Sequence, residues 1–294
     1  MTSNLWRLSA TTIVLRRLKT TGSNFDYKIL LQKRGNISRA GMYTFPGGVH
    51  EKEDNDLRMT AIRELFEEAG VLLCDRYCGD VSEDSFNAWR SSVRQDPSQF
   101  QEMLNQLHAR TRSSELHHFC TFMTPKREKR RYTTLFFIAE VSDDECRFMK
   151  ADGTETASLS WVDPDEALKL NASGKIAIMP PQFYVLKELS QFTSIQEIIS
   201  ALQTEKGYEF STDVAQALFD VRGFPAMQPH PIPQDSSEPT IALCLPYDEV
   251  HPEMPGGIGK RHRIYSKAPL GTGGYSLEKN VSSFGQVEKV TSKL

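Results

Sequence analysis

The sequence of 294 residues predicts an α/β fold of the α+β type, with one large domain and a C-terminal extension. Stretches rich in β-branched and aromatic residues, which are typical of strands, recur between residues 9 and 162. Between them lie segments whose apolar residues repeat at the helical spacing of three and four. After residue 205 this alternation gives way to a segment rich in proline and glycine.

Composition is that of an ordinary globular protein and excludes several functional classes. Apolar residues make up 39% and charged residues 25% of the sequence, and the net charge is −3. This charge argues against a broad basic surface, so nucleic acid is not expected as a partner. No run of 18 apolar residues exists, so no membrane span is expected. The five cysteines contain no CxxC pair, which argues against a zinc ribbon or disulfide framework.

The first expected element is a β-hairpin. Residues 9–18 (SATTIVLRRL) and 27–34 (YKILLQKR) have strand character, and a turn containing Gly22 separates them. The N-terminus is also rich in arginine and has no acidic residue before Asp26, as mitochondrial transit peptides do. We favour the strands, because β-branched residues dominate residues 9–18.

A loop over residues 35–55 leads to a helix expected from Asp56 to Ala69. Asp54 or Asp56 is a candidate N-cap, and Gly70 stands where a glycine ends a helix. One face carries an apolar stripe that should face the core, made of Ile62, Leu65, Phe66 and Ala69.

Three carboxylates share the opposite face of this helix, namely Glu64, Glu67 and Glu68. Like charges at this spacing destabilise an isolated helix. Without other features, they indicate a solvated charged surface. However, Gly47 and Gly48 lie in the preceding loop and allow the backbone to approach a phosphate or to adopt positive φ. Because Mg²⁺ prefers oxygen ligands that it shares with substrate phosphates, we predict that the carboxylates bind Mg²⁺ or Mn²⁺.

The remaining elements continue the alternation. Two helices are expected within residues 82–110 and two more at 164–170 and 181–203. Further strands are expected at 117–124, 131–141 and 156–162. Eight of the fifteen prolines fall between Pro225 and Pro255, so residues 206–294 should form an irregular, β-containing extension.

The acidic helix and its loop resemble the Nudix box. Residues 63–71 (RELFEEAGV) match every fixed position of the second half of that box, and residues 45–48 (FPGG) lie upstream. The first half departs from the pattern, because its glutamate position holds Asp54 when counted from Gly48 and Asn55 when counted back from Arg63. Residues 161–168 also resemble the closing part of a Nudix domain.

This resemblance implies a fold, a reaction and a cofactor. The Nudix fold is a mixed β-sheet sandwiched between helices and would cover residues 8–205, with residues 82–110 as a helical insertion. Nudix hydrolases are metal-dependent and cleave a nucleoside diphosphate linked to another group. Glu64, Glu68 and Glu67 would be the metal ligands. Glu67 and Glu64 would also be catalytic, with Arg63 orienting Glu67 across one helical turn.

Further similarities indicate the substrate. Residues 30–48 partly resemble the segment before the box in coenzyme A diphosphatases, and residues 125–137 and 180–182 are similar to the peroxisomal acyl-coenzyme A diphosphatases. The expected reaction therefore cleaves the diphosphate of coenzyme A or its acyl esters, giving 3′,5′-ADP and (acyl-)4′-phosphopantetheine. The residues expected to bind substrate are Arg34, Arg39, Gly47, Gly48, Arg130 and Arg131. The basic run at 126–131 is equally typical of a solvated entry to a strand.

Several alternatives stay open. The substrate could instead be NADH, ADP-ribose or capped RNA, or the domain could bind a nucleotide or RNA without turnover. Glu140 and Glu155 are candidates for the general base, although either is equally typical of a surface residue. The sequence ends in Ser292-Lys293-Leu294, a peroxisomal address, so the expected location is the peroxisomal matrix and the expected partner is its import receptor.

Overall fold

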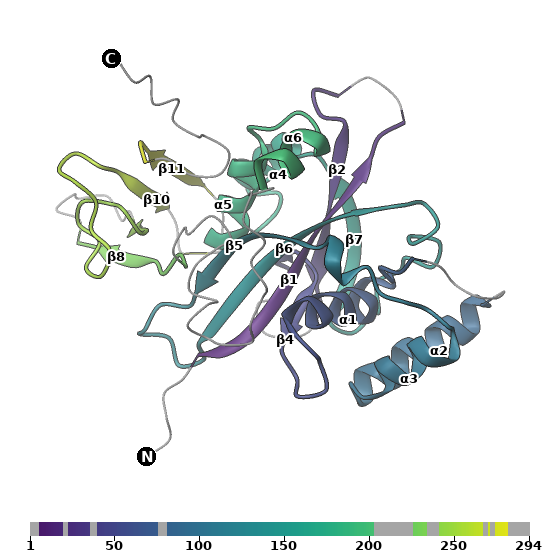
Figure 1. Cartoon of the computed structure of the whole chain (residues 1–294). Helices are drawn as coiled ribbons and strands as arrows, with labels where there is room; N and C mark the ends of the chain where they lie inside the picture. The colour runs from purple at the N-terminus through teal and green to yellow at the C-terminus, as the bar shows by residue number, and fades with distance from the viewer. Residues whose placement is uncertain are drawn as a thin grey trace, which may run out of the picture.

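A seven-stranded mixed sheet forms the centre of the protein (Figure 1). The computed structural model describes residues 6–19, 23–35, 40–75, 81–202, 226–233, 241–266, 270 and 274–281. The strands are β1 (Arg7–Arg17), β2 (Tyr27–Arg34), β3 (Tyr43–Thr44), β4 (Gly47–Val49), β5 (His117–Met123), β6 (Tyr132–Val141) and β7 (Thr156–Val162). They are arranged in the order β3-β2-β1-β6-β5, with β4 also paired to β1 and β7 to β2. Strands β1 and β6 are parallel, and the other pairs are antiparallel.

Helices cover both faces of this sheet, so the predicted sandwich is confirmed (Figure 1). One core cluster joins the sheet to α1 (Leu57–Ala69), α2 (Glu83–Gln95) and α3 (Gln99–Gln106). The other joins it to α4 (Pro164–Ala172), α5 (Pro180–Leu189) and α6 (Ile195–Leu202). The two faces of the sheet therefore pack against two separate hydrophobic cores. The two helices expected within residues 82–110 are α2 and α3, and the short 3₁₀ helix Ser113–Glu115 follows them.

Helix α1 begins and ends as its sequence indicates. The Asp56 side chain accepts a hydrogen bond from the backbone N–H of Met59, so Asp56 is the N-cap and Asp54 is not. Gly70 ends the helix with φ of 69°, a left-handed conformation that favours glycine. The predicted stripe of Ile62, Leu65, Phe66 and Ala69 is fully buried.

The single helix expected at residues 181–203 is wrong, because two helices occupy this segment. Helix α5 ends at Leu189 and α6 begins at Ile195. The break is stabilised by a capping box: the Ser194 hydroxyl accepts from the backbone N–H of Glu197, and the Glu197 carboxylate accepts from the backbone N–H of Ser194. This reciprocal pair satisfies backbone donors that would otherwise be left without partners at a helix start.

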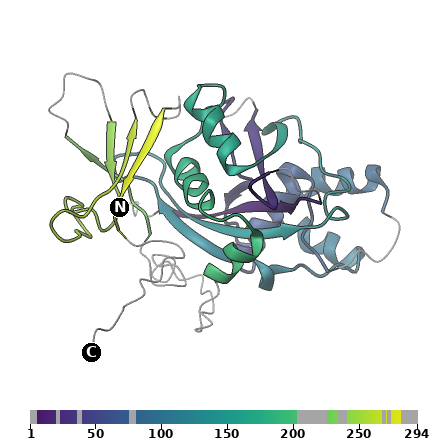
Figure 2. The same ribbon diagram turned by 90° about the horizontal axis from the view of Figure 1, so that it is seen from above.

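The C-terminal segment contains a second, four-stranded antiparallel sheet in the order β11-β10-β9-β8, and Figure 2 shows it at one end of the main sheet. Its strands are β8 (His230–Ile232), β9 (Ile241–Cys244), β10 (His262–Ser266) and β11 (Tyr275–Lys279). The predicted domain boundary near residue 205 lies outside the described residues, as do Arg39 and Ser292-Lys293-Leu294.

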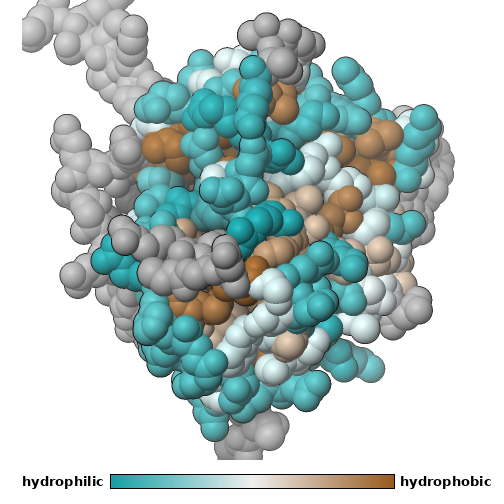
Figure 3. Space-filling view, turned by 90° about the vertical axis from the view of Figure 1, so that its right-hand side faces the viewer, coloured by the Kyte–Doolittle hydropathy of each residue, from teal (hydrophilic) through white to brown (hydrophobic). Residues whose placement is uncertain are grey.

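The surface carries few large hydrophobic side chains. Among the described residues, those exposed are Tyr247, Val250 and Ile258. On the face shown in Figure 3, hydrophobic residues form separate patches within a mostly hydrophilic surface. In the described part of the chain, no helix is both long enough and apolar enough to cross a bilayer.

Candidate active site

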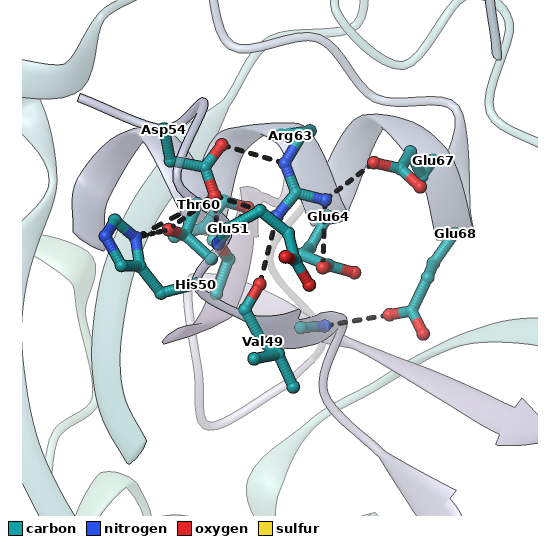
Figure 4. Close-up of polar contacts among 12 residues, drawn as sticks. Val49, His50, Glu51, Asp54, Thr60, Arg63, Glu64, Glu67 and Glu68 are labelled. Atoms are coloured by element: carbon teal, nitrogen blue, oxygen red, sulfur yellow. Dashed lines mark hydrogen bonds and ion pairs between the residues drawn. The ribbon is translucent and has the colours of Figure 1, made fainter. Parts of the chain in front are cut away.

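The acidic face of α1 is covered by the segment that precedes the helix, so it is not the solvated charged surface that the pattern alone would indicate. Only 8% of Glu67 and 5% of Glu68 are exposed, and Glu64 is half-buried. Strand β4 lies over this face (Figure 4). The backbone N–H of Gly47 donates to Glu68 Oε2 at 2.8 Å. The Gln32 amide donates to the same oxygen at 2.7 Å. Antiparallel pairing of β4 with β1 holds this cover in place, and the periodicity of the helix alone does not reveal it.

Arg63 is the centre of an ion-pair network beside these carboxylates (Figure 4). Its Nη1 donates to Glu67 Oε1 at 2.7 Å and to Glu64 Oε1 at 3.0 Å, so the predicted contact between Arg63 and Glu67 is present. On the other side, Nε and Nη2 each donate at 2.8 Å to one oxygen of Asp54. Burial by itself lowers the pKa of Arg63, but these carboxylates outweigh it and raise that pKa overall. Arg63 is therefore a fixed cation that holds Glu67 in one orientation.

Burial also shifts the pKa values of the three glutamates upward. It is the largest influence on Glu68, whose pKa it raises to about 7 against the opposing hydrogen bonds from Gly47 and Gln32. Burial likewise raises the pKa of Glu64, which Arg63 lowers and the neighbouring Glu68 and Glu67 raise further. The pKa of Glu67 is raised by burial against the influence of Arg63. Burial thus disfavours the ionised form of all three carboxylates in the metal-free protein.

This arrangement predicts a pH dependence of stability in the metal-free protein. The folded chain keeps a proton on Glu68 up to about pH 7, whereas an unperturbed glutamate loses it near pH 4.5. The resulting stabilisation is complete below about pH 4.5 and is lost as the pH rises through 7. We expect the melting temperature, measured in EDTA, to fall between these pH values.

Glu68→Gln should flatten this part of the profile, because the amide does not titrate, and Glu102→Gln on the exposed side of α3 is the matched control. An unchanged slope in the Glu68 variant would contradict the assignment.

The two glycines of β4 are needed for packing, and neither has positive φ, so that part of the expectation is wrong. A Cβ atom on Gly48 would lie 2.4 Å from the Glu64 carboxylate. One on Gly47 would lie 2.4 Å from the carbonyl oxygen of Ala10 in β1. The glycines therefore let β4 fit between β1 and the carboxylates of α1.

A cleft of about 1340 Å³ opens beside the acidic residues, somewhat larger than the roughly 300–1,000 Å³ of many small-molecule sites. Its acidic wall is lined by Arg63, Glu64, Glu67 and Glu68, and its basic wall includes Arg34, Arg127, Lys129 and Arg130. Arg131 is not among the lining residues, because its guanidinium stacks 4.7 Å from the centre of the Trp6 ring. The structure thus brings Arg34, Gly47, Gly48 and Arg130 to one cleft and leaves Arg131 outside it.

The two candidates for the general base are separated clearly. Glu140 does not line this cleft, and its carboxylate accepts from Arg17 Nε at 2.9 Å. Glu155 does line the cleft, and its charge contributes to the raised pKa of Glu68. Its backbone N–H donates to Asp152, which orders the turn before β7. Of the two candidates, Glu155 is therefore the one that lies at the cleft.

The sequence did not reveal the residues that contact the acidic site from other parts of the chain. Gln32 holds Glu68, and the pairing of Asp54 with Arg63 was not foreseen from its place in the box or as a candidate cap. Arg90 and Arg94 of α2 donate to the backbone oxygen of Glu67 at 2.9 and 3.1 Å. The spacing of four between these two arginines was the available signal, since it places both on one face of the helix.

The carboxylates fit a hard divalent cation by their chemistry. Glu64 and Glu68 are one turn apart, and both offer oxygen ligands to a cleft that also has a basic wall. As they stand, no three His, Cys, Asp or Glu side chains among the described residues converge to hold a metal ion. Glu67 contacts Arg63, and Glu68 contacts the backbone of Gly47.

Known Nudix proteins are similar to this chain in sequence. Residues 52–189 match the sequence model of the NUDT19 Nudix domain. The chain is 32% identical over 193 residues to nudix hydrolase 7 of Caenorhabditis elegans, covering 63% of this chain and 61% of that protein. It is 28% identical over 225 residues to acyl-coenzyme A diphosphatase NUDT19 of Xenopus laevis, covering 70% of this chain and 54% of that protein. The chain therefore spans about half the length of the curated relatives it matches.

The solved structures support the fold. A NUDIX hydrolase from Alicyclobacillus acidocaldarius superposes with a TM-score of 0.56 at 22% sequence identity. The alignment covers 68% of this chain and 98% of that one. The mixed sheet between two helical layers is thus the Nudix fold.

Proposed function

Because the chain carries a Nudix domain, we propose that it is a metal-dependent diphosphatase that acts on coenzyme A and acyl-coenzyme A. The expected products are 3′,5′-ADP and 4′-phosphopantetheine or its acyl form. The observation that carries the proposal is the cleft in which the acidic wall of α1 lies near a basic wall. The relatives named acyl-coenzyme A diphosphatase support the choice of substrate.

The proposed cofactor is Mg²⁺ or Mn²⁺, held by Glu64 and Glu68 with Glu67 as a further ligand or a base. When bound, such an ion neutralises a diphosphate and lowers the pKa of bound water. Arg63 orients Glu67, since its Nη1 donates to that carboxylate at 2.7 Å. Glu67 or Glu155 then accepts the proton of the attacking water.

The basic wall gives the proposal its specificity. Arg34 and Arg130 line the cleft, and arginine grips phosphate oxygens with two parallel N–H donors. Coenzyme A carries a 3′-phosphate in addition to its diphosphate, so these residues would contact a group that NADH and ADP-ribose lack. Arg34 ends β2 directly beside the turn that carries Glu155, because its register partner is Thr156.

We expect faster metal-dependent turnover of coenzyme A species than of NADH or ADP-ribose. Product analysis by mass spectrometry, with each substrate incubated with Mg²⁺ or Mn²⁺, measures this directly. Dephospho-coenzyme A should show a KM about tenfold higher, because one charged phosphate contact is worth roughly 1.4 kcal/mol or more.

Arg130→Gln should reduce the difference between coenzyme A and its dephospho form, whereas Arg131→Gln, which lies outside the cleft, should preserve it. Preferential hydrolysis of NADH or ADP-ribose would replace the proposed substrate. Binding of nucleotides without any product would indicate a binding module.

A further inference from the structure

One row of paired residues, running across four neighbouring strands of the main sheet, lines the cleft. Val49, Ser9, Thr134 and Phe122 are register partners on β4, β1, β6 and β5, and all four line the cleft. The row continues into the C-terminal segment, because Phe122 forms a β-bridge with Met227. It therefore leads from the strand that covers the carboxylates to Met227, just before the smaller sheet.

The two ends of this row differ in polarity. Near the carboxylates, the Ser9 and Thr134 hydroxyl oxygens lie 2.7 Å apart and hydrogen-bond to one another. Beside β5 the lining includes the basic residues of the β5–β6 connection, and it also includes apolar side chains from the sheet, the start of α5 and the C-terminal segment: Phe122, Phe136, Met179, Pro180, Pro229 and Leu243. Neutral apolar side chains form no hydrogen bond or ion pair with a phosphate or with the ribose next to adenine.

The C-terminal part of this wall is held firmly against the main domain. The backbone N–H of Met227 donates to the Thr121 carbonyl at 2.7 Å, and Met123 donates back to the Met227 carbonyl at 3.0 Å. On the other side, the Tyr184 hydroxyl lies 3.0 Å from Nε2 of the buried His262. Met227 of the C-terminal segment belongs to the same hydrophobic core as Phe122 and Tyr184 of the main domain. The apolar lining therefore has a fixed position relative to the carboxylates.

The length of the row matches a coenzyme A arm. Three strand spacings separate β4 from β5, which amounts to roughly 14 Å. The extended phosphopantetheine arm has about as many backbone bonds as four peptide units, so it spans roughly 15 Å. With its phosphate at the carboxylates, the arm would place its sulfur beside Phe122 and the apolar wall.

We propose that this apolar end of the cleft is a subsite for the acyl group of a thioester substrate, and that the C-terminal segment takes part in substrate recognition through Leu243 and Pro229. The inference rests on the proposed function, because that function places the phosphate at the carboxylate end. It deepens the function by assigning a recognition role to a segment outside the residues that match the family model.

The test compares octanoyl-coenzyme A with free coenzyme A in the full-length protein. Each buried methylene should raise affinity about fourfold, so the wild-type ratio of kcat/KM should favour the octanoyl ester. Met179→Trp fills the subsite from the α5 side and should lower this ratio at least tenfold. Leu243→Ala removes contacts from the C-terminal side and should lower it severalfold.

Two control variants separate the subsite from general effects. Met179→Leu conserves volume and should keep the ratio. Ile258→Trp adds the same bulk to the C-terminal segment at a fully exposed position and should also keep it. Thermal melts establish that each variant is folded, and Met179→Trp carries the test if Leu243→Ala is not.

Binding without turnover distinguishes this proposal from the proposed function. Calorimetry in EDTA measures the affinities for octanoyl-coenzyme A and coenzyme A. If no coenzyme A species is hydrolysed but the octanoyl ester binds more tightly, and Met179→Trp removes that preference, the subsite stands and the proposed function falls. If coenzyme A is hydrolysed but the octanoyl preference is absent, or survives in both folded variants, the subsite is overturned.

Discussion

Glu64→Gln and Glu68→Gln should each lower kcat on coenzyme A by about a hundredfold or more at saturating Mg²⁺. Glutamine keeps the shape of the side chain but lacks the charge that binds a hard divalent cation. Both positions line the cleft, and burial raises the pKa of both carboxylates, so each contributes charge that a bound cation would stabilise. Steady-state rates over a Mg²⁺ titration measure the loss and show whether the apparent metal affinity falls with it.

A core truncation on the same helix provides the contrast. Leu65 is fully buried on the opposite face, and Leu65→Ala should destabilise the fold by about 2–5 kcal/mol while leaving the acidic wall chemically intact. Activity measured well below its melting temperature should therefore stay close to normal. Full activity in both glutamine variants would show that these carboxylates are not metal ligands, and the proposed mechanism would fail.

Local signals made the course of α1 predictable from sequence. The N-cap at Asp56, the left-handed glycine at Gly70 and the buried stripe that includes Leu65 each depend on residues within one or two turns. The positions of β1 and β2 were also predictable from local sequence, because clusters of β-branched residues are typical of strands. Such features need no knowledge of which segments meet in space.

The surroundings of the carboxylates depend on contacts that are distant in sequence. Gln32 reaches Glu68 from β2, and β4 covers Glu64 closely enough to exclude a side chain at Gly48. The helical pattern placed all three glutamates opposite the core stripe, and that is where they lie, but it did not show how closely β4 covers them. The hydrogen bonds from Arg90 and Arg94 to the backbone oxygen of Glu67 could not be predicted for the same reason. They form only when α2 packs against α1 in the folded chain.

The departure from the Nudix pattern before the helix is also explained by a contact. The glutamate expected in the first half of the box is replaced by Asp54, and the following gap is one residue longer. The structure shows that Asp54 nevertheless reaches Arg63 with both carboxylate oxygens and also accepts from the Thr60 hydroxyl at 2.9 Å. The shorter side chain is positioned by the turn at residues 51–54, where the Asp54 N–H donates to the Glu51 carbonyl.

Removal of this carboxylate should therefore have a large effect on stability. Arg63 is only 2% exposed, and Asp54→Ala would leave two of its N–H donors without their partner in a buried site. Breaking a buried ion pair by removing one partner costs about 3–5 kcal/mol. We expect a loss of this size in the free energy of unfolding, measured by urea denaturation at neutral pH without metal.

Asp56→Ala is the matched control, because it removes a carboxylate from the same turn that only caps the helix and should cost about 1 kcal/mol. Arg63→Met tests the pair from the other side, and the double variant Asp54→Ala/Arg63→Met should lose less than the two single variants together, since the second change removes the N–H donors that the first left without a partner. If Asp54→Ala costs no more than Asp56→Ala, then Glu64 and Glu67 neutralise Arg63 by themselves. In that case Asp54 would not be the residue that stabilises the arginine beside the metal ligands.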